Sequence, residues 1–171
     1  MAYRTKTYIA GAWTEDKNAV EALHKWNNND YWGLNFSDAH DLTQARDSSL
    51  NCNIKRSLKG RLDLSKTFVL IVSDATKKVR NGSCQYCSFY ISPTSSCSKG
   101  YSTSLASYVD YECSVAFSEI PKIVVLYNST TVDKSKCPEV LKTKGSHVAM
   151  HKRENGELKW DYQAIKNAIM G

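Results

Sequence analysis

The sequence predicts an α/β fold with a mostly parallel central sheet flanked by helices. Two apolar runs, at residues 66–74 and 122–127, are nearly continuous, as in strands that are covered on both faces. Amphipathic helical patterns separate the strand candidates. This alternation favours right-handed crossovers between parallel strands, and it places a ligand cleft beyond the carboxyl ends of the strands.

The first half of the chain contains two rounds of this alternation. A strand is expected over residues 6–13, because β-branched and aromatic residues lead into a small-residue turn at Ala10-Gly11-Ala12. A helix with Val20 and Leu23 on one face follows and ends before the polar run 27–30. We then expect a short strand over 33–36, a helix over 48–62 and the strand over 66–74.

The second half begins with an irregular, cysteine-rich insertion at about 77–103. A helix is predicted over 104–118, with Leu105, Val109, Cys113 and either Ala116 or Phe117 facing the core. The strand 122–127 follows. The remaining expectations are a weaker strand over 146–151, a turn at Asn155-Gly156 and a last helix over 161–169.

Length and composition narrow the function classes. A chain of 171 residues with 42% hydrophobic and 23% charged residues predicts one globular domain over 1–171. The charged start and the lack of a long apolar run predict a cytoplasmic protein in which the six cysteines are reduced. The net charge of +6 favours an anionic partner, but the basic residues are dispersed. We therefore expect a phosphate-bearing small molecule, and neither nucleic acid nor a membrane.

Five segments, in this order, resemble the TIR-like proteins of bacterial defence, in particular the TIR component of Thoeris anti-phage systems. They are KTYIAGAWTEDK, SDAHDL, IKRSLKGRLDLSKTFVLIVSDAT, SYVDYECSVAF and IPKIVVLYN. The resemblance covers most of the chain and implies a single three-layer, flavodoxin-like domain. The cysteine-rich insertion departs from a minimal domain of this family.

The resemblance implies NAD cleavage by a glutamate on the helix that follows the third strand. The matching residue is Glu112, since Glu119 lies about two turns further from the helix start. A fixed carboxylate can stabilise the oxocarbenium-like ribose that forms when nicotinamide leaves. The alternative is that Glu112 is a solvated helix residue.

Residues around the expected cleft are candidates for binding NAD. Glycine permits a close backbone approach, and Trp13 could stack on a base. Packing is the alternative for Trp13, a surface position is the alternative for His40, and a helix N-cap is the alternative for Asp47. The predicted substrate-binding residues are Ala10, Gly11, Trp13, Phe36, Asp38, His40, Asp47 and Tyr108.

The family further implies a cyclic ADP-ribose-type product that reaches a separate effector protein, and self-association for activity. NAD would be the substrate and no cofactor would be required, which agrees with the lack of GxGxxG and GxxxxGK[ST] motifs. A TIR-like interaction module without chemistry is the main alternative. A receiver-like nucleotide-binding domain is a weaker one, because no acidic pocket with a lysine is evident.

The cysteines allow two interpretations. Cys84 and Cys87 form a CxxC pair with chelating spacing, which together with Cys97 and Cys113 could bind zinc. Reduced, unligated thiols are the expected case. A redox role requires the pair at a helix start, which the surrounding serine and glycine residues do not indicate.

Overall fold

The computed structural model describes residues 3–12, 14–27, 36–37, 50–79 and 81–171. Within these residues the main sheet has four strands in the order β1-β2-β5-β6. Its neighbouring strands all pair in parallel, which confirms the predicted α/β class. The strands are β1 (Lys6–Ala10), β2 (Ser65–Val72), β5 (Lys122–Tyr127) and β6 (Ser146–Ala149).

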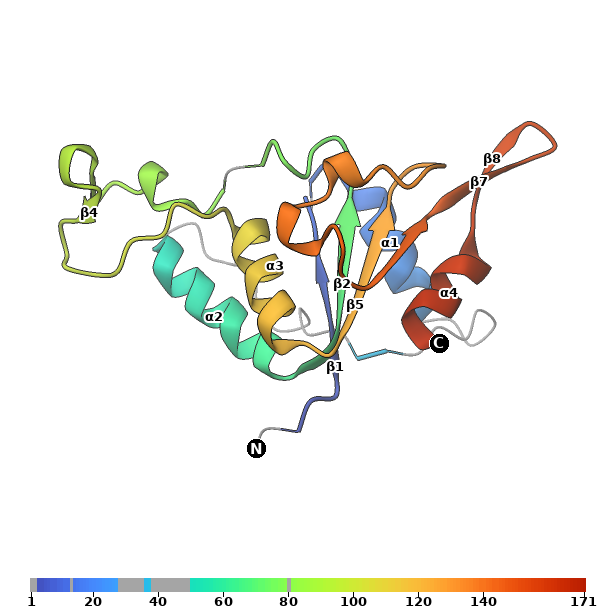
Figure 1. Cartoon of the computed structure of the whole chain (residues 1–171), viewed down its shortest axis with the longest axis horizontal. Helices are drawn as coiled ribbons and strands as arrows, with labels where there is room; N and C mark the ends of the chain where they lie inside the picture. The colour runs from blue at the N-terminus through green and yellow to red at the C-terminus, as the bar shows by residue number, and fades with distance from the viewer. Residues whose placement is uncertain (1–2, 13, 28–35, 38–49, 80) are drawn as a thin grey trace.

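The register brings the carboxyl ends of the strands to one edge of the sheet. Ala10 pairs with Leu70, and Val72 pairs with Tyr127. Helices lie on both sides of this sheet (Figure 1). They are α1 (Lys17–Asn27), α2 (Asn51–Asp63), α3 (Tyr108–Glu119) and α4 (Tyr162–Met170). The loops that follow the strands therefore meet where a ligand site is expected.

One face of the sheet is covered by α2 and α3. Leu58 and Leu62 of α2 and Val109, Cys113 and Ala116 of α3 are buried there. The strands contribute the alternate residues Tyr8, Phe68, Leu70, Ile123 and Val125. Because successive side chains of a strand point to opposite faces, the remaining strand residues serve the second core.

The opposite face is covered by α1 and α4. Leu23 of α1 and Ile165 of α4 are fully buried against Ile9, Ile71 and Val124. The ring of Trp26 meets the rings of Trp160 and Tyr162 edge-on, at centroid distances of 5.6 and 5.3 Å. The two apolar cores make the three-layer arrangement that the alternating pattern predicted.

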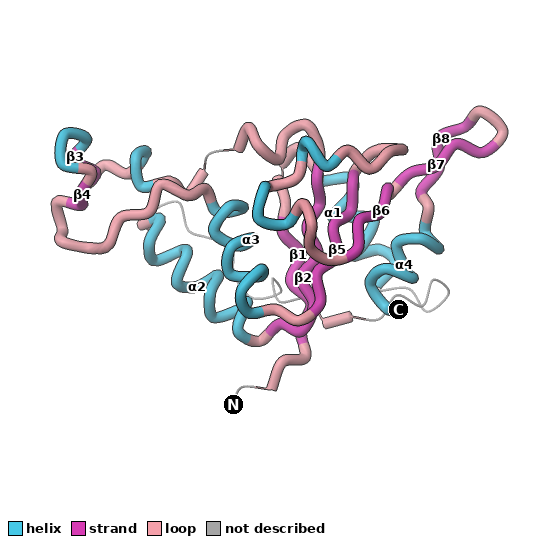
Figure 2. The backbone as a smooth tube through the Cα atoms, in the orientation of Figure 1, coloured by secondary structure: helices cyan, strands magenta, loops and turns pink. Residues whose placement is uncertain are grey.

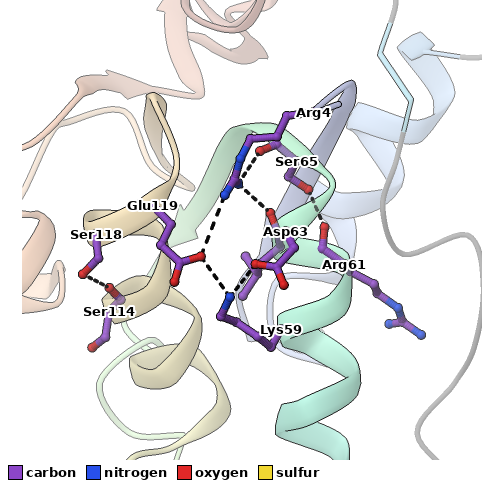
Figure 3. A network of polar contacts seen from close by, with 9 residues as sticks. Arg4, Lys59, Arg61, Asp63, Ser65, Ser114, Ser118 and Glu119 are labelled. Atoms are coloured by element: carbon purple, nitrogen blue, oxygen red, sulfur yellow. Dashed lines mark hydrogen bonds and ion pairs between the residues drawn. The ribbon is translucent and has the colours of Figure 1, made fainter. Parts of the chain in front are cut away.

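Ion pairs hold the end of α3 against α2. Lys59 of α2 contacts both Asp63 on its own helix and Glu119 on α3, with a Lys59 Nζ to Glu119 Oε2 distance of 2.9 Å. Arg4 lies 3.8 Å from the same Glu119 oxygen and donates to the carbonyl groups of Leu62 and Ser65 (Figure 3). Glu119 therefore has a structural role in joining α2 and α3.

The insertion contains only short elements and extends away from the sheet (Figure 2). These are the 3-10 helices η1 (Cys84–Tyr86) and η2 (Ser92–Thr94) and the paired strands β3 (Tyr90–Ile91) and β4 (Ser96–Cys97). The prediction that α3 begins at 104 was wrong. Ser107 is its N-cap, accepting a hydrogen bond from the Asp110 backbone, and Leu105 before it is 55% exposed.

The chain ends in an arrangement that the sequence predicted only in part. The 146–151 strand divides into β6 and β7 (His151–Glu154), and β7 pairs with β8 (Glu157–Trp160), which was not predicted. Asn155 and Gly156 make the predicted turn, both with positive φ angles. Two further 3-10 turns, η3 (Lys134–Lys136) and η4 (Glu139–Leu141), precede β6. None of the helices in the described ranges combines the length and apolarity needed to cross a membrane.

Candidate functional site

Glu112 lies in the second turn of α3 and faces the sheet. The residue is only 6% exposed and lies among the apolar residues of the α2–α3 core. Across the described residues, Oε2 of Glu112 has no hydrogen-bond partner. The alternative of a solvated helix glutamate is therefore wrong. Such a buried carboxyl group costs folding free energy and needs a separate explanation.

Burial is the main cause of an altered Glu112 pKa. It raises the pKa to about 8, while the neighbouring Tyr8 hydroxyl and the more distant Arg61 guanidinium favour the charged form and lower it. Tyr8, from the middle of β1, has a raised pKa through its own burial and through Glu112. The carboxyl group is consequently mostly protonated at neutral pH, and an added positive charge beside it would ionise it.

Tyr108 lies one turn before Glu112 but points to the insertion. Its hydroxyl donates a 3.0 Å hydrogen bond to Oδ1 of Asn51 on α2, and burial raises its pKa to about 12. Gly82, with a φ of +98°, lies so close that a Cβ atom there would be 2.5 Å from the Tyr108 ring. The predicted binding residue Tyr108 therefore contacts α2 and the insertion.

The carboxyl edge of the sheet holds a cavity of about 290 Å³. Asp16 at its base is 1% exposed and accepts hydrogen bonds from Oγ of Ser73 at 2.8 Å and Nδ2 of Asn128 at 3.0 Å. Oδ1 of Asn128 lies 2.9 Å from Nε2 of His151. Burial raises the pKa of Asp16. This network joins the start of α1 to the ends of β2 and β5 and was not predicted from the sequence.

The charges around this cavity do not suit a pyrophosphate. Among the lining residues that the structure describes, Glu15, Asp16 and Asp74 contribute carboxyl groups, and Lys136 is the one cation and lies 2.6 Å from Asp74. Glu112 lines neither this cavity nor the smaller one in the insertion. The acidic pocket with a lysine, which the sequence did not reveal, is present here.

Of the other predicted binding residues, three are described by the structure and pack within the fold, and four lie outside the described residues. Ala10 is fully buried in the α2–α3 core, and Phe36 packs against the α1–α4 core. A Cβ atom at Gly11 would lie 3.3 Å from both Cβ and the carbonyl oxygen of Ile71, so the close approach that requires glycine is made to β2. The remaining predicted binding residues, Trp13, Asp38, His40 and Asp47, lie outside the described residues.

The cysteines are distributed differently from the predicted zinc set. Cys113 is buried in the α2–α3 core, beside Glu112 and Cys137, and is separate from the insertion. Cys52 of α2 instead lines a small cavity with Cys84, Cys87 and Cys97. All six thiols are free, and within the part of the chain that the structure describes no three Cys, His, Asp or Glu side chains form a metal-binding group.

Comparison with known proteins finds a family similarity in the first part of the chain. Residues 7–81 match the family model described as Thoeris protein ThsB, TIR-like domain. The matched segment contains β1, α1, α2 and β2, whereas Glu112 and the insertion lie outside it. No curated protein matches the chain. The parallel sheet agrees with this match, and residues 7–81 are similar to the TIR-like domain of Thoeris protein ThsB.

Proposed function

We propose that this TIR-like protein cleaves NAD at the bond between nicotinamide and ribose, with Glu112 as the catalytic residue. The observation that carries the proposal is the buried carboxyl group of Glu112, whose Oε2 has no hydrogen-bond partner in the described residues. Buried acids with strongly raised pKa values are common at functional sites. The Thoeris-type domain supplies the context of anti-phage defence.

The charge of the substrate suits this carboxyl group. NAD has a cationic nicotinamide ring, and cleavage moves the positive charge onto C1′ and the ring oxygen of the ribose. The electron pair of the C1′–N bond leaves with nicotinamide, which becomes neutral. A carboxylate at C1′ stabilises this oxocarbenium-like ribose, and in a site without water the effect is larger than in solution.

Two nucleophiles can complete the reaction. Water gives ADP-ribose and a proton, whereas a nitrogen of the substrate's own adenine gives a cyclic ADP-ribose isomer. We propose the cyclic product as the signal to a separate effector protein. Self-association is part of the proposal on the strength of the family resemblance alone.

The experiment measures nicotinamide release from NAD by the wild type, Glu112→Gln and Glu119→Gln. The first substitution keeps the side-chain volume and removes the charge, so the rate is expected to fall at least about 100-fold. The second makes the same change on the same helix, at a residue that contacts Lys59 and Arg4, and should leave the rate within about twofold. Equal rates for Glu112→Gln and the wild type would remove Glu112 from the mechanism.

A specific observation favours a second function, that of a non-catalytic interaction module. Glu112 lines neither of the two cavities, and the cavity at the carboxyl edge is acidic. The assay is therefore repeated on concentrated protein and on protein from phage-infected cells. If the wild type releases no nicotinamide in any of these states, the module interpretation holds and the enzymatic one fails.

A further inference from the structure

The insertion and α2 together place four thiols around one small cavity. Cys84, Cys87 and Cys97 come from η1, the residue after it, and β4, and Cys52 comes from α2. The cavity volume is about 20 Å³, and Cys84 and Cys87 are both partly exposed to solvent. Thiols that are grouped and also reachable by solvent are candidates for oxidation, unlike the buried Cys113 and Cys137.

Cys84 and Cys87 are the first and last residues of one tight turn. The backbone N–H of Cys87 donates to the carbonyl of Cys84 at 2.9 Å, and the N–H of Tyr86 donates to that of Ser83 at 3.2 Å. A turn closed in this way holds its end Cα atoms less than about 7 Å apart. A disulfide spans roughly 4.4–6.8 Å between Cα atoms. The backbone is thus already shaped for a bond between the two sulfurs.

Cys84 has the surroundings of the attacking thiol. Its Sγ accepts the backbone N–H of Ser104 at 3.2 Å. The buried ammonium of Lys55 donates to Oγ of this same Ser104 and to the carbonyl of Ala106. A donor and a nearby cation are thus grouped around this sulfur. The pair spans the three-residue 3-10 turn η1 and does not lie at the start of an α-helix, as the sequence predicted.

We propose that Cys84 and Cys87 are a modification site that peroxide oxidises to a reversible disulfide. The Cys84 thiolate attacks hydrogen peroxide, the O–O bond breaks, and hydroxide leaves while Cys84 becomes a sulfenic acid. The Cys87 sulfur then attacks the Cys84 sulfur, the S–O bond breaks, and the oxygen leaves as water. In sum two thiols lose two electrons and two protons, and peroxide becomes two molecules of water. A small dithiol reverses the reaction by exchange.

The turn is joined to the helix that carries Glu112. Asn51 donates from Nδ2 to the carbonyl of Ser83 at 3.1 Å and accepts from the Tyr108 hydroxyl at 3.0 Å. The Tyr108 N–H donates to the carbonyl of Asn81 at 2.7 Å. The disulfide therefore forms next to contacts that fix the start of α3, and its occurrence does not depend on NAD cleavage.

The test treats the folded protein with stoichiometric hydrogen peroxide, blocks the remaining thiols and maps the peptides by mass spectrometry. We expect a fall from six free thiols to four, with the loss of two hydrogen atoms in the tryptic peptide 81–99, which holds Cys84, Cys87 and Cys97. Chymotryptic cleavage after Tyr86 separates Cys84 from Cys87, so the two fragments stay joined only by this disulfide. Dithiothreitol should restore six thiols.

Variants identify the pair. Cys97→Ser and Cys52→Ser should keep the loss of two thiols, whereas Cys84→Ser and Cys87→Ser should abolish it. The wild-type map alone remains decisive if a variant fails to fold. The proposal is overturned if six thiols persist, if the bond joins Cys52 or Cys97, if Cys84 stops at a sulfinic acid, or if metal analysis finds zinc bound to these thiols.

Discussion

The carboxyl group of Glu112 on α3 lies beside the hydroxyl of Tyr8 on β1, in the core between helix and sheet. Burial and the Tyr8 hydroxyl have opposite effects on the pKa of Glu112. Burial favours a neutral Glu112, whereas the Tyr8 hydroxyl favours the carboxylate. Tyr8 was not predicted as a functional residue, since all the residues of its strand from Thr7 to Ala10 are buried and no alternation distinguishes it.

Glu112 should make stability fall as pH rises. Its pKa is about 8 in the folded state and near 4.5 when unfolded, so between these values the folded state holds a proton that the unfolded state releases. This contribution is complete below pH 4.5 and is lost by pH 8, at up to about 1.4 kcal/mol for each pH unit. Glu112→Gln should abolish this slope in urea unfolding at pH 5, 6.5 and 8. Identical slopes in both proteins would contradict the account.

Tyr8→Phe should move the same titration to higher pH. The hydroxyl lowers the pKa of Glu112, so its removal raises that pKa above 8 and extends the fall in stability to more alkaline pH. The matched control is Tyr127→Phe, because the Tyr127 hydroxyl contacts Nδ1 of His147 at 2.8 Å and not Glu112. Unfolding curves at half-unit pH intervals measure the shift; a shift of equal size in both variants would refute it.

Gly82→Ala should disturb the start of α3 much more than Gly100→Ala. Both glycines have positive φ angles, but a Cβ at Gly82 meets the Tyr108 ring at 2.5 Å, whereas one at Gly100 meets nothing within 4 Å. We expect the free energy of unfolding to fall by about 2–4 kcal/mol in Gly82→Ala and by about 1 kcal/mol in Gly100→Ala. Thermal or urea unfolding checks this, and equal losses would show that Tyr108 moves aside freely.

Asp16→Ala should weaken the carboxyl edge of the sheet. The substitution leaves Ser73 and Asn128 without their common acceptor, at a cost of about 2–4 kcal/mol. Glu15→Ala, at the neighbouring exposed residue, should change stability by less than about 0.5 kcal/mol. Hydrogen exchange at the ends of β2 and β5 would report the local effect. Unchanged exchange in Asp16→Ala would mean that the network does not hold this edge.

Most of the fold could be predicted because its signals are local. The apolar runs of β2 and β5 and the spacing of Leu58 with Leu62 depend on neighbouring residues alone. The start of α3 was misplaced because Leu105 fits the helical apolar pattern, although the helix begins only after the Ser107 N-cap. The strand β8 was missed because its residues are mostly exposed, so a hydrophobic pattern does not mark it.

The sites were harder to predict because they join distant residues. Asp16 and Asn128 are separated by 112 residues, and no local pattern connects them. Cys52 likewise comes close to Cys84, Cys87 and Cys97 only because α2 packs against the insertion. Glu112 was proposed through the family resemblance, since its own spacing on α3 does not separate a buried glutamate from a solvated one.

The most direct test of the central claim is the pH dependence of kcat/KM for nicotinamide release from NAD. If the ionised carboxyl group of Glu112 drives cleavage, kcat/KM should rise about tenfold per pH unit below the pKa and level off above about pH 8. Glu119→Gln should give the same curve. A wild-type kcat/KM that does not change between pH 6 and 9 would contradict the assignment of Glu112.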